Sequence, residues 1–175
     1  MLPGHYQAVL TVAGKSYRQN FTVTMDPRIK VSQADLAEEF DLKRKLSDAM
    51  SATYNGYSEV AALRKALAER QKGLTSNPQA KDANDAMQAL VKEVDAVETG
   101  NEKAPGFGTL NREITRLATM VEEGDMRPSA TLRTASEEDF QSLEKAEAQW
   151  QKIKTERIAP INALLQKYQL AALPN

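Results

Sequence analysis

The sequence predicts a mainly α-helical fold, an antiparallel bundle of about four helices preceded by an N-terminal β-hairpin. Three observations lead to this fold class. Residues 6–25 alternate apolar and polar side chains on either side of a turn. After residue 32, apolar residues recur every three or four positions. Of the 175 residues, 41% are hydrophobic, 27% charged and only 6% aromatic, which is typical of a globular protein with an aliphatic core.

The period of two in residues 6–25 predicts the hairpin. Two alternating runs flank the turn Ala13-Gly14-Lys15, a pattern typical of two antiparallel strands. A lone two-stranded hairpin is marginal in water and has two unpaired edges. We therefore expect the following helices, a partner chain or the earlier strands of a β-sandwich to cover it. The apolar positions are Tyr6, Ala8, Leu10, Val12, Tyr17, Phe21, Val23 and Met25.

The first helix is predicted to run from Ser32 to Gly73, after Pro27 has ended the strand pattern. Ser32 and Asp35 have the spacing of a capping box, and glycine is a natural C-terminal cap. Gly56, in the middle of this helix, costs about 1 kcal/mol relative to alanine and marks close packing or a bend. The apolar stripe consists of Leu36, Phe40, Leu46, Met50, Tyr54, Tyr57, Val60, Ala61, Leu63 and Leu67.

The second and third helices are separated by a loop rich in glycine and proline. Asn77-Pro78 is a typical helix start, because an N-cap residue precedes a proline at the first helical position. Apolar residues then step by three and four until Gly100. Residues 101–108 are predicted to be a turn-rich loop, and the third helix follows over residues 107–121.

The fourth helix is predicted after a linker over residues 126–135. Ser136 and Asp139 repeat the capping-box spacing, and an apolar stripe extends from Phe140 to Tyr168. Pro160 lies inside this stripe. Because the pattern resumes in register, we expect the proline to kink the helix rather than to end it. The predicted organisation is a hairpin unit over residues 1–28 and a helical bundle over residues 29–175.

The composition excludes most common chemistries. There is no cysteine and a single histidine, His5, so disulfides, thiol nucleophiles, cysteine-rich zinc sites and histidine pairs are ruled out. A net charge of -1 gives no field for nucleic acid. No apolar run approaches the ~20 residues of a membrane span. We therefore predict no catalytic residues, no cofactor and no metal ligands, and no nucleic-acid or membrane partner.

Two sets of residues are candidates for binding. The apolar side of the hairpin is a candidate interaction surface: Tyr6, Leu10, Tyr17, Phe21 and Val23. Three aromatic residues of the helices are a candidate ligand groove: Tyr54, Tyr57 and Trp150. Aromatic residues at helical spacing more often belong to the core, so both readings of the second set stay open.

Two N-terminal segments carry a family resemblance. PGHYQAVLTVAGKSY at residues 3–17 and FTVTMDPR at residues 21–28 resemble the last strands of an Ig-like module. This module lies near the C-terminus of large bacterial sortilin-like or BNR-repeat proteins, which are glycosyl-hydrolase-like β-propellers. The resemblance continues in TLN at 109–111, RPSAT at 127–131 and INALL at 161–165.

The resemblance implies a function for the chain. It implies a non-catalytic C-terminal structural or interaction module of a larger extracytoplasmic bacterial protein, periplasmic or secreted, whose propeller and signal lie upstream. Upstream domains of the same polypeptide are the implied partners, and no catalytic residue of the family falls on these positions. The alternative is a carbohydrate-binding or hydrolase-accessory domain that uses the aromatic groove. The exposed hairpin edges also predict a homodimer through β-pairing.

Overall fold

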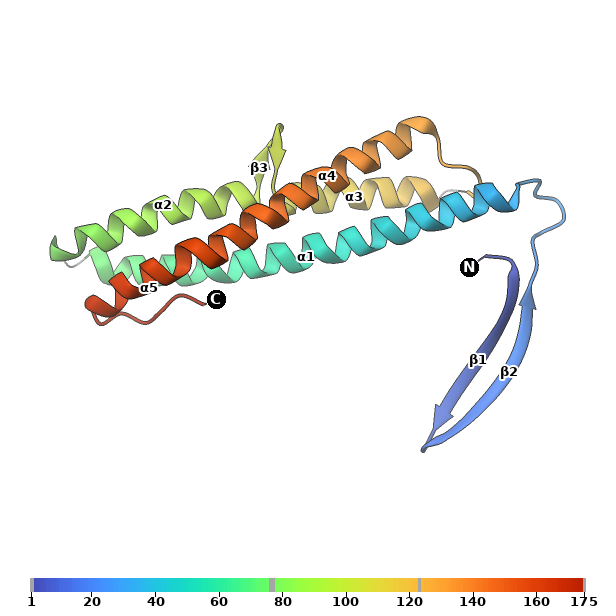
Figure 1. Cartoon of the computed structure of the whole chain (residues 1–175), viewed down its shortest axis with the longest axis horizontal. Coiled ribbons are helices and arrows are strands. Elements are labelled where there is room, and N and C mark those ends of the chain that lie inside the picture. Colours follow the sequence, from blue (N-terminus) through green and yellow to red (C-terminus); the bar gives the residue numbers. More distant parts are fainter. Residues whose placement is uncertain (1, 76–77, 123, 175) are drawn as a thin grey trace.

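The computed structural model describes residues 2–75, 78–122 and 124–174. It shows an elongated helical bundle with a β-hairpin that projects from one end (Figure 1). The predicted mainly helical fold with an N-terminal hairpin is confirmed. The elements are β1 (Gly4–Val12), β2 (Lys15–Val23), α1 (Gln33–Thr75), η1 (Pro78–Ala80), α2 (Lys81–Glu98), β3 (Gly100–Asn101), β4 (Ala104–Pro105), α3 (Phe107–Glu122), α4 (Ala130–Lys152), η2 (Ile153–Arg157) and α5 (Ile158–Lys167).

Strands β1 and β2 pair in nine antiparallel positions, from Gly4 opposite Val23 to Val12 opposite Lys15. The two residues of the turn, Ala13 and Gly14, have φ values of 48° and 79°. Positive φ at both positions is the turn geometry that matches the twist of a two-residue hairpin. The second strand ends at Val23, before the last apolar position of the alternating pattern.

Helix α1 has 43 residues and is therefore about 65 Å long. It is continuous through Gly56. The prediction that Gly73 is its C-terminal cap is wrong, because the helix extends to Thr75. The predicted cap at Ser32 is confirmed. Its Oγ accepts a hydrogen bond from the Asp35 backbone N–H at 3.1 Å and donates one to the Asp35 carboxylate at 2.6 Å.

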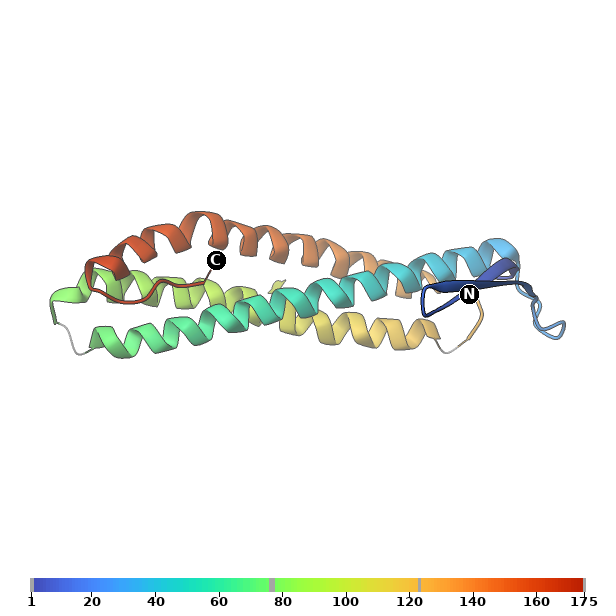
Figure 2. The same cartoon turned by 90° about the horizontal axis from the view of Figure 1, so that it is seen from below.

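Helices α2 and α3 follow one another along α1, and α4 with α5 runs back along both (Figures 1 and 2). Asn77, the predicted N-cap of the second helix, lies outside the described residues, and Pro78 begins η1. The predicted loop between α2 and α3 contains the short β3–β4 ladder. Gly100 has a φ of 67°, and a Cβ there would lie 2.1 Å from the Ala104 carbonyl oxygen, so only glycine fits.

The start of α4 differs from the prediction. The N-cap is Ser129, whose Oγ accepts a hydrogen bond from the Leu132 backbone N–H at 3.2 Å. The predicted cap, Ser136, is buried inside the helix, and its hydroxyl donates to the Leu132 carbonyl. The helix begins earlier because Leu132 and Ala135 pack against the core and extend the apolar stripe towards the N-terminus.

The last helical segment, α4 with η2 and α5, continues through Pro160, as predicted. Between α4 and α5 the chain forms η2, a π-helical turn. Such a turn is one way to accommodate a missing backbone donor without ending the helix. The chain then folds back on the bundle, where Leu173 is buried and its backbone N–H and carbonyl bond to the side chain of Asn162.

The core runs along the helices and is mainly aliphatic. Most positions of the predicted stripes are buried in it, whereas Phe40, Tyr54 and Tyr57 lie at the surface. The largest fully buried side chains are Phe107, Leu46, Leu67, Met87, Leu90, Leu110, Ile114, Ile158, Leu165, Val60, Val94 and Val97.

Candidate functional site

The predicted interaction residues lie together on one side of the hairpin. The register places Tyr6 opposite Phe21 and Leu10 opposite Tyr17, and Val23 continues the same row at the base. The rings of Tyr6 and Phe21 are stacked, with centroids 5.8 Å apart. Leu10 is 63% exposed and Tyr17 is 60% exposed. We call these five residues the apolar hairpin face.

The opposite side of the hairpin is polar, and its side chains bond to one another. Gln7 donates to the Asn20 side chain at 2.9 Å and accepts a hydrogen bond from Arg18 at 3.0 Å. The hydroxyls of Thr11 and Ser16 also lie 3.0 Å apart. These side chains are suited to water, so the two sides of the hairpin differ in the same way as the two sides of an outer sheet of a β-sandwich.

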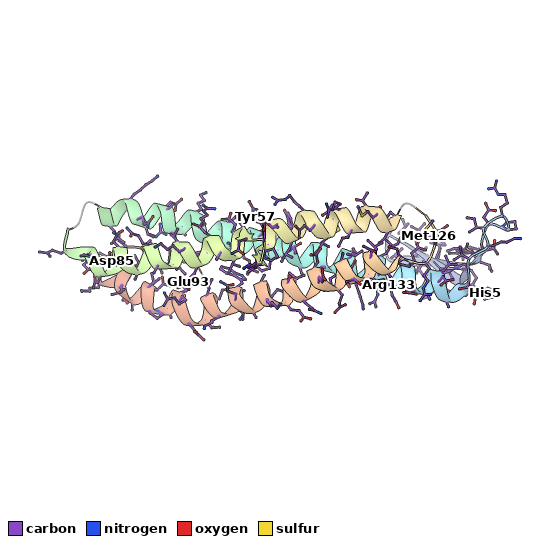
Figure 3. All side chains as sticks on the ribbon, turned by 90° about the horizontal axis from the view of Figure 1, so that it is seen from above. His5, Tyr57, Asp85, Glu93, Met126 and Arg133 are labelled. Carbon is purple, nitrogen blue, oxygen red and sulfur yellow. The ribbon has the colours of Figure 1, made fainter. Side chains whose placement is uncertain are left out.

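Among the described residues, the hairpin meets the bundle at the base of the hairpin. A hollow of about 230 Å³ lies between residues 23–29 and the first turns of α1, with Leu36 and Phe40 in its wall. Beyond this base the side chains of β1 and β2 are exposed. Figure 3 shows the same arrangement, with His5 beyond the helices at one end of the molecule. The Nδ1 atom of His5 lies 3.0 Å from the Thr22 hydroxyl, within hydrogen-bonding distance.

The second candidate set centres on Trp150, which is only 6% exposed. Its indole N–H donates to the Glu59 carboxylate at 2.8 Å, and the Lys154 ammonium donates to the same oxygen at 2.9 Å. Lys154 also lies 5.5 Å from the centre of the Trp150 ring. The hydrogen bonds from Lys154 and then Trp150 lower the pKa of Glu59. This group of three side chains ties α4 and η2 to α1.

A hollow of about 620 Å³ lies beside this contact, between α1 and α4. Neither Tyr54 nor Tyr57 is among the described residues that line it. Tyr54 is 66% exposed, and the ring of Tyr57 lies against Gly108 at the start of α3, near the middle of the bundle (Figure 3). The structure therefore does not bring the three predicted aromatic residues into one groove. The lining residues are Ala52, Asn55, Gly56, Glu59, Phe107, Glu144, Glu147, Ala148, Trp150, Gln151 and Lys154.

The acidic residues do not gather into a metal centre in the described part of the chain, where no three histidine, aspartate or glutamate side chains converge. Asp139 on α4 is the most perturbed carboxyl: burial and then the charge of Glu113 raise its pKa to about 6. Within residues 2–75, 78–122 and 124–174, no helix has the length and apolar character needed to cross a membrane.

Sequence reasoning missed several buried polar contacts that join the helices. Thr53 is fully buried and accepts a hydrogen bond at 2.8 Å from Asn111, which fixes α1 against α3. Asn111, Ser129 and Asn162 each have a hydrogen bond to another segment or to the helix backbone. In the sequence, the only sign of these contacts is a single polar residue inside an apolar stripe.

Comparisons with family models, curated proteins and solved structures find no match to the chain.

Proposed function

We propose that the chain is a non-catalytic structural and interaction module at the C-terminal end of a larger extracytoplasmic bacterial protein. Its partner is an upstream domain of the same polypeptide, which packs on the apolar hairpin face. The observation that supports this proposal is the exposure of that face, because soluble proteins rarely leave a contiguous row of large apolar side chains open to water.

Covering this face stabilises the pair of domains. Complete burial of one large apolar side chain contributes about 1.5–3 kcal/mol. Leu10, Tyr17 and Phe21 are all more than 40% exposed, so covering these three contributes on the order of 3 kcal/mol. A second β-sheet packed about 10 Å away is the usual cover for such a face.

The helical bundle acts as a rigid arm in this proposal. Its polar contacts, such as Trp150 with Glu59 and Asn111 with Thr53, hold one helix to another. The bundle thereby forms an arm of about 65 Å that carries the hairpin at one end.

The first test is the size of the native polypeptide in extracts of its source, detected with an antibody against this 19.3 kDa chain. A band several times larger supports the proposal, and a band at 19.3 kDa contradicts it. Trypsin provides a second test, because Lys15 is exposed and its side chain lies on the same side of the hairpin as Leu10 and Tyr17. We expect cleavage after Lys15 in the isolated chain and protection of this site in the native polypeptide.

A carbohydrate-binding or hydrolase-accessory role is the second candidate, and the hollow beside Trp150 is the observation that favours it. Trp150 is the only tryptophan, so its fluorescence reports on this hollow alone. Because Trp150 is buried and bonded to Glu59, we expect weak quenching by acrylamide and no shift with oligosaccharides. A saturable shift that Glu147→Gln abolishes would favour the carbohydrate role instead.

A further inference from the structure

We infer that the free edge of β1 binds the free edge of β1 in a second copy of this chain, which makes a continuous four-stranded antiparallel sheet. The interaction uses the backbone of Gly4–Val12. It is separate from the proposed function, which uses the side chains of the apolar hairpin face. The four strands then lie in the order β2, β1, β1 and β2, with a two-fold axis between the copies.

The β1 edge lacks the features that usually prevent pairing between sheets. Such features are charged side chains, proline, bulges and very short strands. Strand β1 has nine residues, none of them proline, lysine, arginine, aspartate or glutamate. Its nine pairs with β2 are continuous and therefore contain no bulge. Strand β2 carries Lys15 and Arg18, charged side chains of the kind that protect an edge strand from pairing.

The backbone groups that point outward from β1 follow from the ladder. In an antiparallel pair, residues alternate between those that bond to the neighbouring strand and those whose N–H and C=O point away from it. Val12 and Lys15 flank the two-residue turn and bond to each other in the usual hairpin geometry. Counting back from Val12, the residues with outward groups are His5, Gln7, Val9 and Thr11.

A symmetric pairing centred on Ala8 satisfies all of these groups. Gln7 then lies opposite Val9 of the second copy, and His5 lies opposite Thr11 of the second copy. Because the two-fold axis is perpendicular to the sheet, the apolar hairpin faces of both copies lie on the same side. The dimer therefore leaves that face free for an upstream domain.

The contact is small. A single nine-residue edge buries less than the roughly 1,200 Å² that stable complexes bury, so the isolated chain dimerises only at high micromolar concentration. Sedimentation equilibrium of the unmodified chain tests this directly. We expect a dimer of twice the 19.3 kDa mass. A chain that stays monomeric at high micromolar concentration overturns the inference.

Cross-linking identifies the edge. The chain has no cysteine, so Ala8→Cys introduces a single thiol at the centre of β1. Opposed Cβ atoms at such a position lie about 4.5–5.5 Å apart, near the range that a disulfide spans. Gln19→Cys is the matched control, because Gln19 is the partner of Ala8 at the centre of β2. We expect Ala8→Cys to form a disulfide-linked dimer at least tenfold faster than Gln19→Cys; equal rates, or a faster Gln19→Cys, overturn the choice of edge.

Proline variants test pairing through the β1 edge without removing a hydrogen bond from within the hairpin. Val9 and Arg18 are opposite each other, and by the same alternation both backbone N–H groups point outward. Val9→Pro therefore removes a donor from the β1 edge and none from the hairpin, and we expect it to abolish the dimer. Arg18→Pro makes the same change on β2 and should leave the dimer unchanged. Equal effects of the two substitutions on dimerisation would contradict pairing through β1.

Discussion

Substitution of Gly56 by alanine tests the packing of the longest helix. Gly56 lies in α1 against the ring of Phe107 at the start of α3. A Cβ built on Gly56 lies 2.6, 2.7 and 2.8 Å from three atoms of that ring. Helix propensity alone predicts that Gly56→Ala stabilises the protein by about 1 kcal/mol. The structure predicts the opposite, because real Cβ atoms do not approach a ring so closely.

The expected size follows from the surroundings of Phe107. Its side chain is only 1% exposed, so an added Cβ at Gly56 can be accommodated only by displacing a buried ring. Overpacking of this kind costs about 1–3 kcal/mol, and three contacts below 3.0 Å place this case near the upper end. After the gain of about 1 kcal/mol in propensity, we expect a net loss of about 1–2 kcal/mol in the free energy of unfolding.

Urea unfolding followed by the fluorescence of Trp150 measures this loss. Ala62→Gly, at an exposed position of the same helix, calibrates the effect of propensity without a packing change. A second substitution, Phe107→Leu, removes the ring, so Gly56→Ala should be less harmful in its presence. If Gly56→Ala alone raises the free energy of unfolding by about 1 kcal/mol, the close contact is refuted and only propensity remains.

Three further predictions concern single side chains. Ser129→Ala removes the N-cap of α4 and should lower the free energy of unfolding by about 1 kcal/mol in urea titrations. Asp139 has a pKa of about 6 in the folded state, above its ordinary 3.8, so its ionisation destabilises the fold as pH rises through that interval. Asp139→Asn should therefore raise the melting temperature above pH 6 and have little effect below pH 3.8, as calorimetry at both pH values will show. Asn162→Ala removes both hydrogen bonds to Leu173 and should speed the removal of residues 168–174 by carboxypeptidase.

Periodicity predicts the elements well because each has one apolar face. The apolar stripes therefore identify the helices, and alternation identifies the two strands. The predicted start of α4 was wrong because the local sequence makes both Ser129 and Ser136 plausible N-caps. Only the packing of Leu132 and Ala135 against distant helices decides between them. For Pro160 the sequence predicts a kink, but it does not show that the chain forms a π-helical turn over residues 153–157.

The candidate sites were predictable to different degrees. The apolar hairpin face follows from local pairing alone, because cross-strand register is set by a two-residue turn. The surroundings of Trp150 do not follow from local sequence, since its hydrogen-bond partner Glu59 is 91 positions away. Tyr57 and Trp150 have the same helical spacing within their stripes, yet one is exposed and the other buried. Spacing gives the face of a helix but not what packs against it.

The two proposals concern two surfaces of the same hairpin, and single substitutions distinguish them. Tyr17→Ser changes the apolar hairpin face and leaves the β1 edge intact, so it should weaken protection from trypsin in the native polypeptide but not the cross-linking of Ala8→Cys. Val9→Pro changes the β1 edge and should have the reverse effects. The hairpin permits this separation because side chains and outward backbone groups point in perpendicular directions. In the bundle, by contrast, the polar side chains of Thr53, Asn162 and Trp150 have hydrogen bonds within the chain, which hold one segment to another.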